Sequence, residues 1–349
     1  MAVGVIGHGR MGEHHAQAVA ACPNAELVAV CDPASAALDR GAALGARYVT
    51  SDLSHLFDLA LDAVVIASPS WLHAAHIQAA AAAGVAIFVE KPVALTPEEA
   101  ETALRAVIAH GVTFQIGFQR RWDPRYRRMR SAIDAGEIGD PILIRAHGRD
   151  PGPSERRTWG IDRNGGIFLN CAIHDYDTVH FMSGSEITSV SATGAALVNH
   201  ELRSIGDADI CLSTLWLGEG AMAVTEWNRF SRSGYDVGME VIGTRGTIAL
   251  TPSVALGSNV ILRRPNGRLP RLFDVFGDAF TAAIEGFVEA VIKREPAEPG
   301  VEEAHLALRV ALAARASSAS DGVRLHIPSS PQLIAANEPV EKCSPHHGL

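Results

Sequence analysis

A histidine near the middle of the chain lies where it could exchange a proton with a bound molecule. In NGGIFLNCAIHDYDTVHFM, residues 164–182, Asn170, His174 and Asp177 follow at i, i+4 and i+7, so they share one face of a predicted helix. The apolar residues between them would pack the other sides of that helix. A histidine can accept or release a proton near neutral pH, which suits a general base or acid. The alternative for this stretch alone is an interior histidine that is hydrogen-bonded to its neighbours.

A lysine is the second candidate for chemistry. Lys91 directly follows the predicted strand VAIFVE, residues 85–90, and precedes Pro92. Packing does not require a lysine at such a place, whereas its ammonium group could stabilise an oxygen that gains negative charge during a reaction. A solvated surface lysine is the alternative. The Lys91–Pro92 bond is also a candidate for a cis peptide, a form that is essentially confined to X–Pro bonds.

The start of the chain carries a glycine pattern that is typical of dinucleotide binding. GHGRMG, residues 7–12, follows the apolar strand 2–6 and opens a predicted helix. In this setting Gly7 permits a tight turn, Gly9 lets the backbone approach a pyrophosphate, and Gly12 lets the helix pack on the strand. The helix N-terminus itself attracts the phosphates. The alternative is a glycine turn that only packs.

An acid at the end of the second predicted strand indicates which dinucleotide is bound. Asp32 ends the strand AELVAVCD, residues 25–32, at the place where a carboxylate accepts hydrogen bonds from the adenosine ribose. No arginine directly follows Asp32, and the carboxylate would repel a 2′-phosphate. We therefore expect NAD rather than NADP.

The elements that must position these groups alternate regularly in the first part of the chain. Helix-like and strand-like segments follow in turn at 51–59, 62–68, 72–83, 85–90, 96–111 and 112–118. This alternation predicts a parallel sheet with helices on both faces, a Rossmann fold. Ligands bind beyond the carboxyl ends of the strands in such sheets, which draws attention to SPSWLH, residues 68–73, and to EKP, residues 90–92.

From Pro141 onward the pattern changes to longer strand-like runs, several of which are joined by turns suited to hairpins. The runs cover 141–149, 187–197, 207–217, 220–230, 235–243, 246–250 and 259–265. They predict an open, largely antiparallel sheet. Because few predicted helices remain, at 276–294 and 301–318, we expect a second subunit to cover one face of that sheet.

The fold class expected from these patterns is α/β, with an N-terminal Rossmann domain followed by a C-terminal α+β domain. We place the dinucleotide-binding domain at 1–119, the substrate-binding and oligomerisation domain at 120–326, and a surface tail at 327–349. Cys343, His346 and His347 in that tail could catch a metal ion, but a solvated tail is the expected state.

Composition excludes several classes of partner. The 349 residues carry a net charge of −9, which does not suit nucleic acid or an anionic membrane, although the run from Arg120 to Arg130 is basic. No secretory leader is visible, and the apolar run 79–89 is interrupted by Gly84 and is too short to span a bilayer. The five cysteines are scattered without metal-ligand spacing, which is typical of a reduced cytoplasmic protein without structural zinc.

Over nearly its whole length the chain resembles the Gfo/Idh/MocA oxidoreductases, and within them the inositol 2-dehydrogenase branch. The family resemblance rests on GHGRMG at 7–12, Asp32, SPSWLH at 68–73, EKP at 90–92, GFQRR at 117–121 and GGIFLNCAIHDYD at 165–177. The likeness to the inositol branch rests on RDPGP at 149–153, the IHDYD stretch, SGYD at 233–236 and EVIGTRG at 240–246.

This resemblance implies roles for individual residues. Lys91 and His174 match the family's catalytic lysine and histidine, Arg120 and Tyr235 match substrate-contacting positions, and Asp150 is expected close to them. The expected cofactor-binding residues are Gly7, Gly9, Arg10, Met11, Gly12, Asp32, Ser68, His73 and Glu90.

Asn170, which we count among the catalytic residues, departs from the pattern of the inositol branch. That branch usually has an aspartate four residues before the histidine, and this chain has an uncharged amide. A nearby carboxylate raises the pKa of a histidine. We therefore expect His174 to stay neutral to lower pH than it would beside an aspartate.

The activity implied by the resemblance is NAD-dependent oxidation of a secondary alcohol of a cyclitol, namely myo-inositol to 2-keto-myo-inositol (scyllo-inosose). His174 would accept the hydroxyl proton and Lys91 would stabilise the oxygen, without any metal. The alternatives are another polyol or sugar (scyllo-inositol, an aldose or a nucleotide-linked sugar) and a non-catalytic NAD-sensing protein. We expect a homotetramer in the cytoplasm that binds neither nucleic acid nor membrane.

Overall fold

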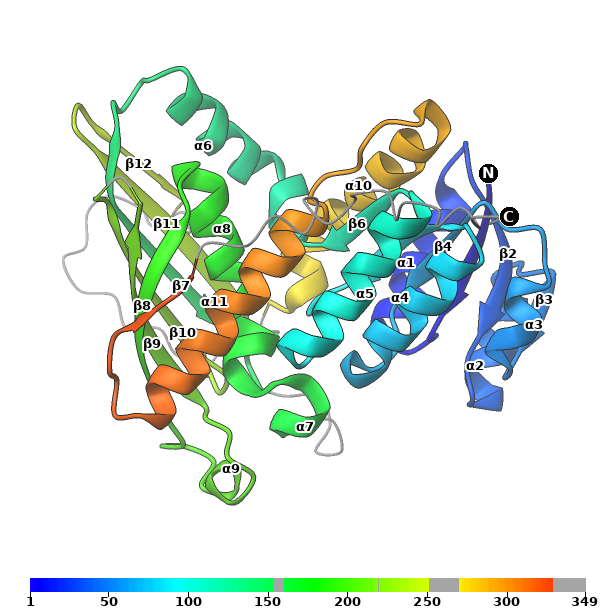
Figure 1. Ribbon diagram of the computed structural model, residues 1–349, viewed down its shortest axis with the longest axis horizontal. Coiled ribbons are helices and arrows are strands. Elements are labelled where there is room, and N and C mark those ends of the chain that lie inside the picture. Colours follow the sequence, from blue (N-terminus) through cyan, green and yellow to red (C-terminus); the bar gives the residue numbers. More distant parts are fainter. Residues whose placement is uncertain (153–159, 219, 251–269, 329–349) are drawn as a thin grey trace, which may run out of the picture.

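The computed structural model describes residues 1–152, 160–218, 220–250 and 270–328. They form two sheets at opposite ends of the molecule, and most of the long helices lie between or beside them (Figure 1). The α/β class with a parallel N-terminal sheet and a mixed C-terminal sheet is confirmed. The expected strand at 259–265 and nearly all of the expected tail, with Cys343, His346 and His347, lie outside the described residues.

The N-terminal sheet is parallel throughout and has the strand order β3-β2-β1-β4-β5-β6. Its strands are β1 Ala2–Ile6, β2 Glu26–Cys31, β3 Tyr48–Thr50, β4 Ala63–Ile66, β5 Ala86–Glu90 and β6 Phe114–Gly117. The central strands β4 and β5 are buried along their whole length, because helices cover both faces of the sheet. This explains why these segments are continuous apolar runs without alternation.

Helices α1 Arg10–Ala21, α2 Ser35–Ala43, α3 Leu53–Phe57, α4 His73–Ala82 and α5 Pro97–His110 connect these strands. The sequence marks the ends of α5 clearly. Thr96 accepts a hydrogen bond from the Glu99 N–H at the start of that helix, and Gly111 adopts the left-handed conformation at its end. Two short 3₁₀ turns, η1 Ser70–Leu72 and η2 Gln119–Trp122, follow β4 and β6.

Helix α10, Leu272–Lys293, returns from the far end of the sequence to pack on the N-terminal sheet. Its residues Ile284, Phe287 and Val288 belong to the same buried cluster as Val5 and Phe88 of the central strands. Although α10 falls in the stretch assigned above to the second domain, it completes the core of the first. Nothing local in its sequence indicates this, because an apolar helix face does not specify which sheet it covers.

The C-terminal sheet has the order β12-β11-β7-β10-β9-β8-β13 among the described residues. Its strands are β7 Pro141–Arg149, β8 Ile187–Ala195, β9 Ile210–Leu217, β10 Met222–Asn228, β11 Asp236–Gly243, β12 Thr247–Leu250 and β13 Leu325–His326. Neighbouring strands are antiparallel except for the parallel pair β7 and β10. The short strand β13 was not expected.

One face of this sheet is covered by α8 Ile173–Ser183 and α11 Val301–Ala319 (Figure 1). Along β10, buried and exposed residues alternate strictly from Met222 to Trp227, as expected for a strand with one face on the core. The opposite face exposes Leu212, Met222 and Val224. The remaining helical segments are α6 Pro124–Asp134, α7 Ile161–Asn164, η4 Phe168–Ala172 and α9 Glu201–Ser204.

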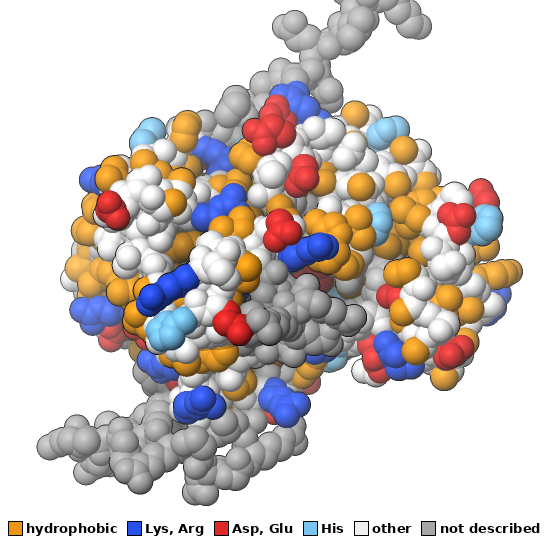
Figure 2. All heavy atoms as spheres, turned by 90° about the horizontal axis from the view of Figure 1, so that it is seen from below, with side chains coloured by type: hydrophobic (Ala, Val, Ile, Leu, Met, Phe, Trp, Pro, Cys, Tyr) orange, Lys and Arg blue, Asp and Glu red, His pale blue; other side chains and the backbone are white. Residues whose placement is uncertain are grey.

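Four arginines of the basic run near Arg120 form ion pairs with aspartates. Arg120 pairs with the buried Asp175 and Arg121 with the buried Asp177, whereas Arg125 and Arg130 form partly exposed pairs with Asp123 and Asp134. On the face shown in Figure 2, basic, acidic and apolar side chains are interspersed. Within the described ranges, the helices all fall short of the length and hydropathy that a membrane span requires.

The contact between α10 and η2 gives a prediction about stability. An alanine Cβ at Gly286 would lie 1.8 Å from the ring of Trp122, so we expect Gly286→Ala to lower the free energy of unfolding by about 1–3 kcal/mol. Gly277, in the same helix, has nothing within 4 Å of an added Cβ. Gly277→Ala should instead raise stability by roughly 0.5–1 kcal/mol, the ordinary helix preference. Urea unfolding of both variants decides this, and equal effects would contradict the packing explanation.

Candidate active site

A cavity of about 190 Å³ lies beyond the carboxyl ends of the N-terminal strands, where the two domains meet. It brings together eight of the residues singled out from the sequence, namely Arg10, Met11, Ser68, His73, Glu90, Lys91, Asn170 and His174. Lys91 follows β5, Asn170 lies in the π-helical turn η4, and His174 lies at the start of α8. Segments about 80 residues apart therefore meet in one site, as the rule for α/β sheets predicts.

The glycine turn fits a dinucleotide phosphate. Gly7 has φ +86°, and a Cβ there would lie 2.6 Å from the backbone of Ser68. A Cβ at Gly12 would lie 1.8 Å from the Gly7 carbonyl oxygen. Gly9, the N-cap of α1, has nothing within 4 Å of an added Cβ, so the missing side chain leaves space over the helix N-terminus. The first backbone N–H groups of a helix have no intrahelical acceptor and can bind phosphate there.

Asp32 is held at the edge of this turn. Its carboxylate accepts hydrogen bonds from the backbone N–H of His8 at 2.7 Å and of Ala34 at 2.9 Å. Arg40 lies nearby: its guanidinium donates to the His8 carbonyl oxygen at 2.9 Å and to Glu13 at 3.1 Å. This arginine, which the sequence pattern did not single out, is thus occupied within the protein, and the charge next to the ribose position is negative.

His73 joins the two loops that follow β4 and β5. Its ring nitrogens lie 2.8 Å from the Ser68 carbonyl oxygen and 2.7 Å from that of Pro92. The Lys91–Pro92 bond in the second of these loops, which was a candidate for a cis peptide, is cis. Glu90, the last residue of β5, is buried and accepts a hydrogen bond from the His15 ring at 2.8 Å. Lys91 is therefore held by a framework that also forms the floor of the cavity.

The ammonium group of Lys91 is directed at Asn170. It donates to the Asn170 carbonyl oxygen at 2.6 Å and to the side-chain oxygen at 3.2 Å. Burial lowers the pKa of Lys91, and the neighbouring Glu90 opposes this effect. From the sequence, Asn170 was expected to act on the histidine or on a substrate, but the structure pairs it with the lysine. The reason is that η4 turns both of its oxygens toward the end of β5.

His174 is buried beside this pair. Its pKa lies well below the ordinary value, first because of burial and then because Lys91 and Arg120 are positive. Its Nδ1 has no hydrogen-bond partner among the described residues, and the edge of its ring meets Phe118 at 6.2 Å between centroids. His174 is therefore neutral at neutral pH, the form in which an imidazole can accept a proton.

Arg120 is buried and does not line the cavity. The guanidinium pairs with Asp175, which also accepts a hydrogen bond from the Trp227 ring. Although burial lowers the pKa of Arg120, Asp175 holds it above its ordinary value, so the arginine stays charged. Its Nε and Nη2 have no partner among the described residues. Asp175, next to His174 in sequence, was not singled out because the i, i+4, i+7 spacing selected Asp177 instead.

Asp177 does not share the site with Asn170 and His174. It accepts hydrogen bonds from Arg121 at 2.8–3.1 Å. The π-helical turn η4 changes the helical phase between Asn170 and His174, whereas His174 and Asp177 both belong to α8 and are three residues apart. The carboxylate of Asp177 is thus taken up by Arg121 and does not line the cavity that Asn170 and His174 share.

Asp150 and Tyr235 lie close to the cavity but are not part of its lining. Burial raises the pKa of Asp150, while the positive charges of Arg10, Arg229 and Lys91 act in the opposite direction. Burial also raises the pKa of Tyr235, against the effect of Arg120. These two groups thus border the cationic side of the site, and the tyrosine keeps its proton at neutral pH.

Sequence reasoning missed other residues that line the cavity, among them Gln119, Leu272 and Phe280. Gln119 lies two residues after the end of β6, so the rule that drew attention to residues after β4 and β5 would also have found it. Phe280 and Leu272 belong to α10 and reach the site only because that helix returns to the first sheet. No local signal could have identified them.

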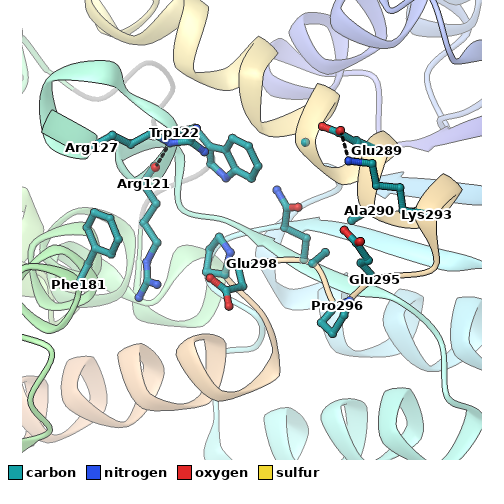
Figure 3. A pocket seen from close by; sticks show the side chains of 14 residues that line it. Arg121, Trp122, Arg127, Phe181, Glu289, Ala290, Lys293, Glu295, Pro296 and Glu298 are labelled. Carbon is teal, nitrogen blue, oxygen red and sulfur yellow. Dashed lines mark hydrogen bonds and ion pairs between the residues drawn. The ribbon is translucent and has the colours of Figure 1, made fainter. Parts of the chain in front are cut away.

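A larger cavity, of about 420 Å³, lies on the other side of the η2 turn. Arg121 and Trp122 lie on one side of it and Glu289 and Lys293 on the other (Figure 3). Its charged groups are largely occupied: Arg121 binds Asp177 and Lys293 binds Glu289. Lys91, Asn170 and His174 all line the smaller cavity, and none of them lines this larger one.

The contacts of Asp32 give a prediction about the cofactor. A 2′-phosphate would meet the Asp32 carboxylate, so we expect kcat/KM with NAD to exceed that with NADP by at least about tenfold, equivalent to only about 1.4 kcal/mol. Asp32→Ser should reduce this preference by removing the charge. Glu13→Gln, which changes the partner of Arg40 but keeps Asp32, is the matched control and should retain it. Equal efficiency of the unmodified protein with both cofactors would refute the assignment of Asp32.

Comparison with known proteins places both halves of the chain in one family. Residues 1–118 match the oxidoreductase family with an NAD-binding Rossmann fold, and residues 126–249 match the GFO/IDH/MocA C-terminal domain.

Individual relatives cover most of the chain. The scyllo-inositol 2-dehydrogenase (NAD(+)) of Bacillus subtilis is 38% identical over 82% of this chain and 85% of its own. The inositol 2-dehydrogenase of Rhizobium meliloti is 36% identical over 89% of this chain and 94% of its own. The crystal structure of myo-inositol dehydrogenase from Lactobacillus casei in complex with NAD(H) and myo-inositol superposes with a TM-score of 0.81 at 28% identity, covering 95% of this chain and 99% of that one. The chain therefore belongs to the Gfo/Idh/MocA family of oxidoreductases.

Proposed function

We propose that this protein is an NAD-dependent dehydrogenase that oxidises one secondary alcohol of a cyclitol, with myo-inositol as the substrate and 2-keto-myo-inositol (scyllo-inosose) as the product. The observation that carries the proposal is the convergence of Lys91, Asn170 and His174 in one cavity at the carboxyl ends of a dinucleotide-binding sheet. The inositol dehydrogenases among the relatives support the choice of substrate class.

The groups of the site suit removal of a hydroxyl proton. When bound, the nicotinamide supplies the acceptor for the hydride that leaves the alcohol carbon. His174 accepts the hydroxyl proton, and it is available as a base because burial and nearby positive charges keep it neutral. An ammonium group has three N–H donors, and Lys91 uses two of its own on Asn170. The third is directed to the substrate oxygen, where it offsets the developing negative charge.

The remaining hydroxyls of the ring meet polar groups that border the cavity. Arg120 offers its unpartnered Nε and Nη2, and Tyr235 and Asp150 add a hydroxyl and a carboxyl group. A site built to bind hydroxyls rejects analogues that lack them, because its own buried polar groups would then be left unpaired. This favours a polyhydroxylated ring over a simple alcohol.

Two other functions are weaker. Oxidation of another polyol or sugar (scyllo-inositol, an aldose or a nucleotide-linked sugar) uses the same residues and differs only in the fit of the hydroxyl groups. A non-catalytic NAD-sensing protein has no need for a lysine and a neutral histidine in the same cavity, so the presence of Lys91 and His174 argues against it.

Turnover with a panel of inositols and aldoses tests the proposal directly. We expect NADH formation from myo-inositol with the highest kcat/KM, and we expect Lys91→Met to lower kcat by roughly two to three orders of magnitude while NAD binding is retained. Preference for scyllo-inositol or for an aldose would redirect the substrate assignment. Binding of NAD without turnover of any of these alcohols would favour the sensor.

The pairing of Asn170 with Lys91 predicts how pH affects the reaction. The base must be neutral, so the acidic limb of kcat/KM should lie below the ordinary histidine pKa of 6.5. Lys91 must be charged, so the alkaline limb should lie below the ordinary lysine pKa of 10.5. In Asn170→Asp a carboxylate replaces the amide oxygen 3.2 Å from Nζ and should raise the alkaline limb by about one unit, with a smaller rise of the acidic limb.

The matched control is Asn170→Ala, which removes the amide without adding a charge and should lower kcat without the upward shift of the alkaline limb. Because the two titrating groups are close, each limb belongs to the coupled site rather than to one residue. Superimposable profiles of Asn170→Asp and the unmodified protein would mean that position 170 does not tune Lys91.

We also propose a cytoplasmic homotetramer that forms through the open face of the C-terminal sheet. Leu212, Met222 and Val224 are 46%, 36% and 42% exposed on that face, which an interface with another subunit would bury. Light scattering should give an oligomer, and Leu212→Glu with Val224→Glu should dissociate it. Ile292→Glu on α10, which is 53% exposed, should not. A monomer at micromolar concentration would refute the proposal.

The buried free cysteines Cys22, Cys31, Cys171 and Cys211 suit a reducing compartment.

A further inference from the structure

We propose that the buried pair of Asp207 and Arg229, here called the Asp207–Arg229 clip, positions Lys91 for catalysis by holding both ends of the turn that carries Asn170. This inference rests on the proposed function for its kinetic consequences, while the geometry is independent of it. Neither residue lines the cavity, so both are positioning residues rather than catalytic ones.

The turn that needs holding is unusual. Residues Phe168–Ala172 form the π-helical segment η4, which precedes α8. A π-helical turn is rare and is frequently found at functional sites. Here the turn contains Asn170 and ends two residues before His174. Its exact shape therefore determines where the Asn170 oxygens lie.

Asp207 holds the start of the turn. One carboxylate oxygen accepts the backbone N–H of Ile167 at 2.8 Å and that of Ala208 at 2.8 Å. The approach is so close that a Cβ at Gly166, which has φ +72°, would lie 2.9 Å from this oxygen. The second carboxylate oxygen accepts Arg229 Nη1 at 2.6 Å.

Arg229 holds the end of the turn. Its Nε is 3.5 Å from the sulfur of Cys171, the residue that directly follows Asn170. The side chains of Arg229 and Asp207 are only 5% and 1% exposed, so the pair is sealed from water and its geometry is not averaged by solvent. A guanidinium can make both contacts at once because its donors form a rigid planar fork.

The consequence appears at the ammonium group. With Ile167 and Cys171 fixed, the carbonyl and amide oxygens of Asn170 lie 2.6 Å and 3.2 Å from Lys91 Nζ. These contacts leave one direction for the third N–H of the lysine. If the clip is lost, η4 can relax toward an α-helical turn, and Lys91 loses the acceptors that orient it.

Kinetics of a neutral double variant test the clip. Asp207→Asn with Arg229→Met removes the ion pair and the contact to Cys171 without leaving an unpaired buried charge, and it keeps an acceptor for Ile167. We expect kcat with myo-inositol to fall roughly 10- to 100-fold, as misplacement of a reacting group does, while the Kd for NAD is unchanged. The matched control is Asp177→Asn with Arg121→Met, an ion pair of similar burial (side chains 1% and 10% exposed) that does not touch η4, and its kcat should change little.

A double-mutant cycle that combines the clip variant with Lys91→Met distinguishes loss of Lys91 positioning from general structural damage. If the clip acts through Lys91, breaking it in the Lys91→Met background should cause no further fall in kcat. A fall of the same size in both backgrounds would overturn the proposal, as would an unchanged kcat in the double variant.

Labelling of Lys91 decides the geometry without any turnover. Acetic anhydride should modify Lys91 faster in the clip variant than in the unmodified protein or the control, as measured by peptide mass spectrometry. Equal rates would overturn the clip even if the enzyme is active. Absence of cyclitol turnover by the unmodified protein would refute the proposed function instead, and the labelling result would still stand.

Discussion

The arrangement of the site depends on the two hydrogen bonds by which the Lys91 ammonium group binds the carbonyl and amide oxygens of Asn170. Lys91 belongs to the N-terminal sheet and Asn170 to the turn before α8, so these bonds cross the junction of the domains. They fix a cation at the place where the cofactor-binding sheet meets the cavity. The cis Lys91–Pro92 bond, the His73 bridge and the Asp207–Arg229 clip all lie around this one contact.

Burial is the physical condition that makes these groups useful. It lowers the pKa of both His174 and Lys91, and each change serves a different purpose. The histidine becomes a neutral proton acceptor at ordinary pH, whereas the lysine remains close enough to Glu90 and Asn170 to keep its charge and its direction. For Arg120 the pKa moves in the opposite direction: Asp175 raises it, so Arg120 stays charged although it is equally buried. A buried charge is tolerated only with a partner of this kind.

The parts of the fold and site that could be predicted from sequence are those encoded locally. The glycine turn, Asp32, and the loops after β4 and β5 each follow a strand directly, so the rule about carboxyl ends is enough to locate them along the chain. The return of α10 to the first sheet, the π-helical phase of η4 and the role of Asp207 and Arg229 depend on contacts between distant segments. Asp175 and Asp177 illustrate this, since two aspartates that differ by two positions bind different arginines.

The return of α10 also explains why the cavity lies where it does. By packing Ile284, Phe287 and Val288 on the N-terminal sheet, this helix completes the first core, and its early residues Leu272 and Phe280 then form part of the cavity wall. The sheet supplies the glycine turn and Lys91, η4 and α8 supply Asn170 and His174, and α10 supplies an apolar wall. Because His174 is buried and this wall is apolar, the contacts among Lys91, Asn170 and His174 act at a lower effective dielectric than they would on a surface. The apolar wall and the polar groups are therefore parts of one electrostatic arrangement.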